Sequence, residues 1–168
     1  MARPVDLHRR QATLAKAASY VLEHGLAGLS LRPLAKALDT SPRMLLYDFE
    51  SKERLIEEIL AEIRRREAAL LEVEVRSLDD VWRWISRPER EPFLRLFFET
   101  YVDALGRDDA KPLVHDWLAV LETTWRPHVD PATATLMIAV VRGLLLDRLA
   151  TGDRERTDAA MTRFVELS

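Results

Sequence analysis

Apolar residues recur at helical spacing along nearly the whole chain, and this periodicity limits the fold more than any other feature. In the first such segment Leu14, Ala17, Ala18, Val21 and Leu22 follow the i, i+3, i+4, i+7, i+8 pattern of one buried helix face. Gly and Pro together number only 13 of the 168 residues, and the helix formers Ala, Leu, Glu and Arg dominate. No segment reads convincingly as a strand. The sequence therefore predicts an all-α protein.

Capping and breaking residues divide the chain into about nine helices. Gly25 ends the first helix, and Ser30 is expected to cap a short second helix that runs to Leu38. Ser41 and Pro42 open a third helix that ends near Tyr47, and Ser51 caps a longer fourth. Further helices are expected from Ser77 to before Pro88, over 94–105 to a stop at Gly106, over 114–121 to before Pro127, from Asp130 to Gly152, and from about Asp153.

Several classes of protein are excluded by composition. The chain has no cysteine, so disulfides, thiolate metal sites and cysteine nucleophiles are absent. No segment resembles a signal peptide, and the longest apolar run, 136–146, is too short to span a bilayer and is interrupted by Arg142. We therefore expect a cytoplasmic protein. We also find no phosphate-binding glycine loop, nucleophile elbow or metal-spaced His/Glu pattern, so neither an enzyme nor a cofactor is expected.

The charge is divided unevenly along the chain. The net charge is −3, yet residues 1–54 carry nine Lys and Arg against six Asp and Glu, while the remaining 114 residues carry sixteen against twenty-two. A basic head on an acidic body is expected when only one end of a protein meets phosphate.

Two short helices joined by a three-residue turn, and preceded by an amphipathic helix, form a helix-turn-helix. The third helix would enter the major groove of DNA while the second braces it. The residues expected to face the groove are Ser41, Pro42, Arg43 and Met44. Tyr47, Lys52 and Thr40 are placed to contact phosphate, Thr40 at the positive end of the third helix. Arg3, Arg9 and Arg10 are candidates for a loose basic arm.

The segment 25–55, GLAGLSLRPLAKALDTSPRMLLYDFESKERL, resembles the DNA-binding region of TetR-family regulators. The matching positions are Ser30, Arg32, Leu34-Ala35, Thr40-Ser41, Tyr47, Phe49, Ser51-Lys52-Glu53 and Leu55. More loosely, RGLLLDRLATGDRERTDAAMTRF resembles the last two helices of such proteins. The resemblance implies a DNA-binding domain over 1–54, joined by a long helix to a ligand-binding and dimerisation domain over 55–168. It also implies a homodimeric regulator that binds a palindromic double-stranded operator.

Three residues depart from the family pattern. Asp39 stands where the turn usually has Gly, but Asp tolerates a left-handed backbone better than most residues. Asp48 replaces a common His, and Glu50 replaces a small residue. We expect these two carboxylates to lie beside the phosphate-facing edge and to weaken DNA binding.

Aromatic residues gather in the middle helices of the second half. In the resembling family this region encloses a small-molecule pocket, so the residues proposed to bind a ligand are Trp82, Phe97, Tyr101, Trp117 and Leu121. The ligand is expected to be apolar or aromatic and to release a repressor from its operator. His115 and Asp116 are adjacent and point to different helix faces, so no metal site is expected there.

The helix from Asp130 is apolar in nearly every direction. A helix of this kind must be covered on more than one side, and the last helix supplies only part of that cover. Gly143 lies within this helix, where glycine lowers helix stability by about 1 kcal/mol relative to Ala. We therefore expect that another helix crosses close to this position. The sequence therefore predicts a homodimer through the last two helices.

Two other functions remain open from the residues alone. One is a helical ligand-binding or adaptor protein with a weakened DNA-binding head, which the departures at Asp39, Asp48 and Glu50 would permit. The other is an enzyme built on the pocket, which would need an acid or base with a perturbed pKa.

Overall fold

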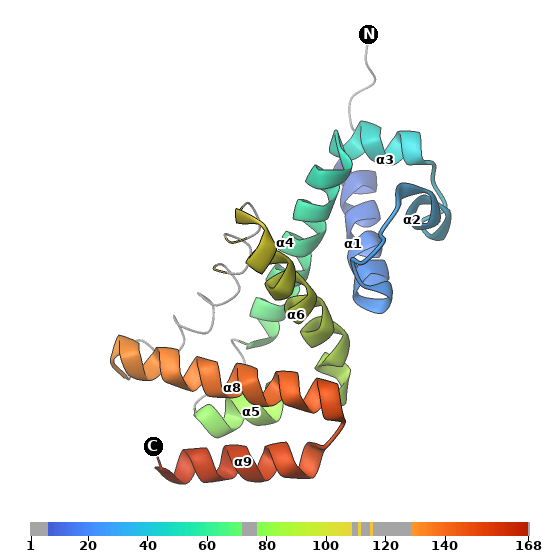
Figure 1. The fold of residues 1–168 in the computed structure, drawn as a ribbon. Coiled ribbons are helices and arrows are strands. Elements are labelled where there is room, and N and C mark those ends of the chain that lie inside the picture. The colour runs from blue at the N-terminus through green and yellow to red at the C-terminus, as the bar shows by residue number, and fades with distance from the viewer. Residues whose placement is uncertain (1–6, 72–76, 109–110, 112–114, 116–128, 168) are drawn as a thin grey trace. The chain divides into compact units, whose positions relative to one another are not determined.

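A computed structural model describes residues 7–71, 77–108, 111, 115 and 129–167 (Figure 1). Every regular element within these ranges is a helix, which confirms the predicted fold class. None of the helices in the described ranges is long and apolar enough to cross a membrane.

The chain divides into two compact units, residues 1–69 and residues 70–168. The fourth helix belongs almost entirely to the first unit. The proposed division by function after residue 54 stays a prediction.

The first unit contains α1 (Leu7–His24), α2 (Leu31–Ala37), α3 (Pro42–Phe49) and most of α4 (Lys52–Leu71). Its core takes residues from all four helices: Leu14, Ala17, Ala18, Val21, Leu34, Ala35, Leu45, Phe49, Leu55, Ile59, Leu60 and Ile63. Of the five residues that helical periodicity predicts on the buried face of α1, Leu14, Ala17, Ala18 and Val21 are buried and Leu22 is half-buried.

Side-chain caps set where α3 and α4 begin. The Ser41 hydroxyl accepts a hydrogen bond from the Met44 N–H at 3.2 Å, and the Ser51 hydroxyl accepts one from the Arg54 N–H at 3.0 Å. Both caps confirm the sequence prediction. Ser30 occupies the N-cap position of α2, but its side chain makes no capping hydrogen bond, so that part of the prediction is wrong.

Two non-glycine residues adopt positive φ at the ends of the second and third helices. Asp39 has φ 52° in the turn between α2 and α3, as its tolerance of the left-handed region predicts. Glu50 has φ 69° after α3, where a small residue is common in the resembling family. The third helix runs two residues further than predicted because Phe49 is buried in the core.

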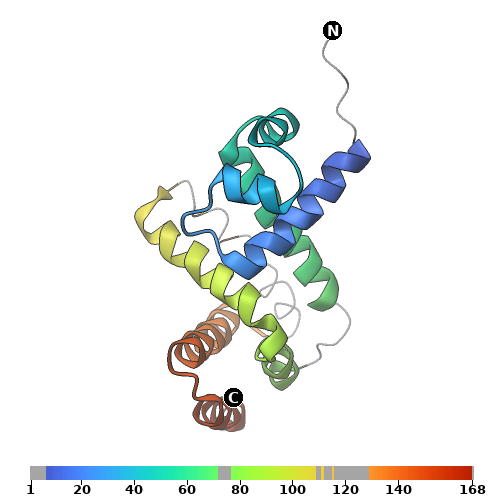
Figure 2. The same ribbon diagram turned by 90° about the vertical axis from the view of Figure 1, so that its right-hand side faces the viewer.

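The second unit contains α5 (Leu78–Ile85), the 3₁₀ helix η1 (Pro88–Arg90), α6 (Glu91–Gly106), α8 (Pro131–Thr151) and α9 (Arg154–Leu167). The last two helices lie side by side in both views (Figures 1 and 2), joined at Gly152, whose φ is 73°. Asp130 caps α8 by accepting hydrogen bonds from the N–H groups of Ala132 and Thr133. The helix predicted over 114–121 lies outside the described residues.

The eighth helix is apolar on two opposite sides. One side is buried in the unit and includes Ala134, Ile138, Val141 and Leu145. The other side is an exposed stripe of small and apolar residues: Ala132, Thr135, Leu136, Ala139, Gly143, Leu146 and Ala150. These residues follow helical spacing, so they form one continuous face, hereafter the α8 stripe.

Candidate nucleic-acid interface and ligand pocket

The two faces of α3 have opposite surroundings. Leu45 and Phe49 are each 1% exposed and fix the helix to the core of the first unit. On the other face Ser41 and Arg43 are exposed, Met44 is 36% exposed and Tyr47 is 42% exposed. Four of the residues predicted to meet DNA therefore share one accessible face of a helix whose other face is buried.

The other residues predicted to meet DNA lie at the start of α3, in the turn before it, and on the neighbouring helices α2 and α4. Ser30 and Arg32 are exposed at the start of α2, while Pro42, Thr40 and Lys52 are half-buried. The Thr40 N–H donates to the carbonyl of Ala35 in α2 at 2.9 Å, so this donor already has a partner.

Arg9 and Arg10 do not form a loose arm. They lie in the first turn of α1, and both bind Asp48 near the end of α3. Arg9 Nη2 donates to the Asp48 carboxylate at 2.7 Å, and Arg10 Nε donates to the Asp48 carbonyl at 2.8 Å. Arg3 lies outside the described residues.

Of the two carboxylates expected to repel DNA phosphate, Asp48 and Glu50, one is exposed. The Asp48 side chain is 1% exposed and ion-paired, so the expectation that it lies at a phosphate-facing edge is wrong. Arg9 and Asp48 are 39 residues apart in the sequence, so the sequence alone does not indicate this ion pair. Glu50 is exposed, so the expectation that it repels phosphate remains.

Among the residues predicted to bind a ligand, Trp82 belongs to the packed core of the second unit. It is buried, its Nε1 donates to the Asp158 carboxylate at 2.7 Å, and the Arg148 guanidinium lies 4.8 Å from its ring centroid. Its role toward a ligand stays a prediction.

The half-buried rings of Phe97 and Tyr101 lie together on α6. Their centroids are 5.9 Å apart, and Arg142 of α8 lies over the Tyr101 ring at 4.9 Å. The structure thus brings two of the five predicted ligand residues into contact. Trp117 and Leu121 lie outside the described residues.

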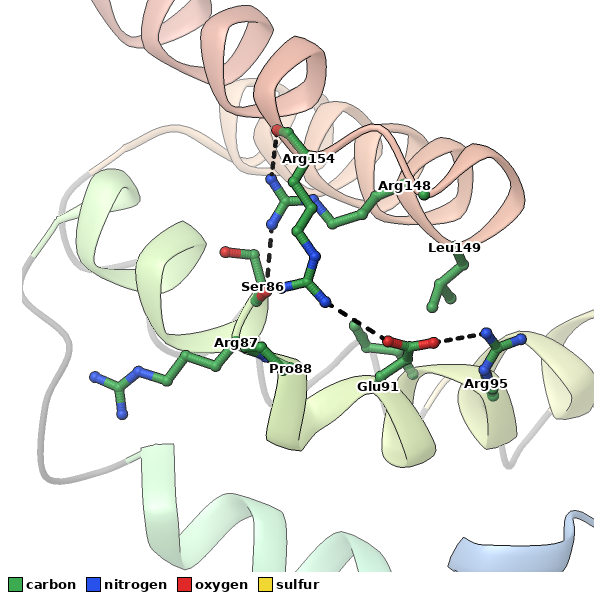
Figure 3. A pocket seen from close by; sticks show the side chains of 10 residues that line it. Ser86, Arg87, Pro88, Glu91, Arg95, Arg148, Leu149 and Arg154 are labelled. Carbon is green, nitrogen blue, oxygen red and sulfur yellow. Dashed lines mark hydrogen bonds and ion pairs between the residues drawn. The ribbon is translucent and has the colours of Figure 1, made fainter.

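A pocket of about 120 Å³ opens where α5 ends, α6 begins, α8 ends and α9 begins (Figure 3). Its lining is Ser86, Arg87, Pro88, Glu91, Leu94, Arg95, Arg148, Leu149, Gly152 and Arg154. None of the predicted ligand residues is among them. Glu91 accepts a hydrogen bond from Arg95 at 2.6 Å, and its other oxygen lies 3.8 Å from Arg154.

Arg148 forms the inner wall of this pocket and has hydrogen-bond partners on several elements. Its guanidinium donates to the Thr157 hydroxyl at 2.9 Å, to the carbonyls of Ser86 and Arg154, and to the Asp158 carboxylate. In the sequence, the one indication of this pocket is the charge of Arg148 within an apolar helix. Within the described ranges no three His, Asp or Glu side chains are grouped to hold a metal ion.

Two short helices joined by a tight turn, the second with one accessible face and one face in the core, form the arrangement of a helix-turn-helix. Residues 14–59 match the model of the bacterial regulatory proteins of the tetR family. Residues 14–59 therefore form a DNA-binding region of the tetR type, which supports a DNA-binding transcriptional regulator. Regulators of this family act by binding DNA and not by catalysis.

Solved structures resemble the chain over nearly its whole length. The multidrug binding protein EbrR complexed with ethidium is 26% identical with a TM-score of 0.74, and the match covers 92% of this chain and 97% of that one. EbrR complexed with proflavin is 25% identical with a TM-score of 0.71, covering 92% and 98%. Salmonella enterica GusR, at 20% identity and a TM-score of 0.66 with 98% and 97% covered, shares the fold. No curated protein matches the sequence.

Proposed function

We propose that the chain is a cytoplasmic repressor that binds a palindromic operator as a homodimer and is released by a small aromatic or apolar molecule. The observation that carries the DNA-binding part is the accessible face of α3, with Arg43, Met44 and Tyr47 exposed over a buried Leu45 and Phe49. The residues proposed to contact DNA are Ser30, Arg32, Thr40, Ser41, Pro42, Arg43, Met44, Tyr47 and Lys52.

Base recognition would depend on few side chains. The chain has no Asn and a single Gln, at position 11, so the amide contact to adenine is absent from α3. Arg43 is the candidate for a paired hydrogen bond to guanine, and Met44 for an apolar contact to a thymine methyl group.

The exposed α8 stripe supports dimerisation. Leu136 is 57% exposed and Leu146 is 50% exposed, although both belong to an apolar helix. A Cβ built on Gly143 meets no described atom within 4 Å, so no crossing with a described helix of the same chain requires glycine there. A close approach by α8 of a second copy would cover the stripe and give Gly143 its packing reason.

Relatives support an aromatic ligand. EbrR has been solved with ethidium, proflavin and malachite green. In this chain the contacting rings of Phe97 and Tyr101 offer apolar and π surface for such a molecule, and Arg142 would move or stack against it.

Binding of the purified protein to a labelled random duplex, measured by fluorescence anisotropy over a salt series, tests the DNA-binding part. The proposal predicts binding at low salt, with an affinity that falls linearly on a log–log plot against salt concentration. Absence of binding at low salt would instead favour the helical ligand-binding or adaptor protein.

Quenching of intrinsic tryptophan fluorescence by malachite green tests the ligand part, measured on protein alone because intercalating dyes also bind DNA. The proposal predicts saturable quenching that weakens in Tyr101→Ala. Arg83→Ala, on exposed α5 surface, is the matched control and should leave quenching unchanged. Quenching that does not saturate would contradict an aromatic ligand site.

A further inference from the structure

The end of α3 is held by a network of charged groups that the DNA contacts do not use. The buried Asp48 carboxylate accepts a hydrogen bond from Arg9 at 2.7 Å, and the carbonyl of the same residue accepts one from Arg10 at 2.8 Å. Two consecutive residues of α1 therefore hold one residue of α3 by its side chain and its backbone.

Arg10 extends this network to α4. Its Nη2 donates to both carboxylate oxygens of Glu58, at 2.6 Å and 2.8 Å, and its guanidinium lies 4.6 Å from the centroid of the Phe49 ring. Arg54 lies 3.7 Å from the same Glu58 carboxylate. The start of α1, the end of α3 and the first half of α4 are thus joined by Arg9, Arg10, Asp48 and Glu58, hereafter the α1–α3 clamp.

The geometry of α3 gives this clamp its importance. The helix has only eight residues, and its buried side chains Leu45 and Phe49 lie one turn apart on a single face. Apolar contacts are non-directional, so they hold the helix against the core without fixing its rotation closely. Charge-assisted hydrogen bonds are directional, and those to Asp48 fix the rotation at the residue next to Tyr47.

We propose that Arg9 and Arg10 are positioning residues, which set the orientation of the recognition helix through Asp48 and Glu58 and do not serve as phosphate contacts. The inference rests on the proposed DNA-binding function of α3. Loss of the clamp would leave α3 able to meet phosphate but would displace Arg43 and Met44 from the base edges. Discrimination between operator and random DNA would therefore fall more than affinity for random DNA.

A double-mutant cycle with Arg9→Ala, Asp48→Ala and the double variant tests this proposal. Each is measured for affinity to a selected operator and to a random duplex, for the slope of affinity against salt, and for the free energy of unfolding. Each single variant should lower the ratio of operator to random affinity by about tenfold, the effect of losing one good base contact. Arg9→Ala should add nothing in the Asp48→Ala background, and Arg9→Lys should restore part of the ratio.

Lys16→Ala is the matched control, because it removes an exposed cation from the same helix; its ratio should stay at the wild-type value. A phosphate contact by Arg9 would instead weaken binding to both duplexes equally and reduce the salt slope by about 0.9, which would overturn the proposal. A purely structural role would lower the free energy of unfolding and leave the ratio of the folded protein unchanged, which would also overturn it. If the wild type binds neither duplex, the proposed function fails, and the inference fails with it.

Discussion

Arg43 and Lys52 lie at the same helix-turn-helix, but their replacement by Ala should affect DNA binding in different ways. Arg43→Ala should relax the preference at one base pair in each half-site and cost about 1–3 kcal/mol if the guanidinium makes a paired contact. Lys52→Ala should weaken binding to all sequences alike and flatten the salt dependence. Affinities for the operator and its single-base variants distinguish the two effects. Unchanged sequence preference in Arg43→Ala would contradict base recognition by this residue.

Glu50 is the exposed carboxylate that remains at the end of α3, and its removal should strengthen DNA binding. We expect Glu50→Gln to tighten binding most at low salt, where screening of like charge is weakest. Asp48→His should have the opposite effect, because it leaves Arg9 without its buried partner. Anisotropy titrations at two salt concentrations measure both. Weaker binding by Glu50→Gln at low salt would refute the repulsion.

Local signals in the sequence identify residue roles that depend on near neighbours. Ser41 and Ser51 are correctly predicted as caps, and Asp130 as the start of a helix, because a cap and the N–H group that donates to it lie within three residues. Asp48 is misplaced because its exposure depends on Arg9, which is far away in the sequence. The clamp could be found only once α1 and α3 were placed together.

At the scale of elements, Glu62 links α4 to itself and to α1. Hydrogen bonds from Arg65 and then Arg66, opposed by burial, hold the pKa of Glu62 below its ordinary value of 4.5. Arg66 also donates to the Ala15 carbonyl of α1 at 3.0 Å. Because the folded pKa is lowered, this stabilisation is fully present above about pH 4.5 and is lost as the pH falls through the folded pKa.

Glu62→Gln should therefore lower the free energy of unfolding by about 1–3 kcal/mol near neutral pH. The difference from wild type should shrink as the pH falls below about 4.5. Urea unfolding across this pH range measures the difference in the free energy of unfolding between the two proteins. The exposed Glu57→Gln is the control and should show a smaller effect. A difference that stays constant into acid would show that the charge of Glu62 does not contribute.

The α8 stripe predicts the oligomeric state. Gly143→Phe should separate the dimer while the monomer stays folded, because Gly143 is exposed and a Cβ added there meets no described atom of its own chain within 4 Å. Arg83→Phe adds the same ring on exposed surface of α5 and should leave the dimer intact. Light scattering after size exclusion measures the mass. A wild type that is monomeric at micromolar concentration would contradict dimerisation.

Helical periodicity and capping predict the order and approximate ends of the described α-helices, since both are local properties of the chain, but they do not predict the 3₁₀ helix η1. They do not predict the arginine-rich pocket. That pocket is formed by the ends of four helices, and its residues come from segments as far apart as Ser86 and Arg154. The inner wall depends on Arg148, whose partners lie on α9 and at the end of α5.

For the whole molecule, regulation requires that ligand and DNA affect each other's binding. A ligand shifts the equilibrium only by the difference in its affinity for the DNA-binding and the released states. By linkage, operator DNA must weaken ligand binding by the same factor as ligand weakens DNA binding. At one fixed concentration of malachite green, where dye bound to DNA is the same for both proteins, operator affinity should therefore fall more for the wild type than for Tyr101→Ala; an equal fall in both would contradict regulation by this ligand.

Recognition of DNA through α3 of a dimer is tested by sequencing random DNA fragments selected by the purified wild-type protein, with Arg43→Ala selected in parallel. We expect a palindrome whose half-sites lie about 34–36 Å apart, one helical turn or a multiple of it. Arg43→Ala should lose one position of each half-site. Enrichment of no sequence, or the same palindrome with Arg43→Ala, would contradict the claim.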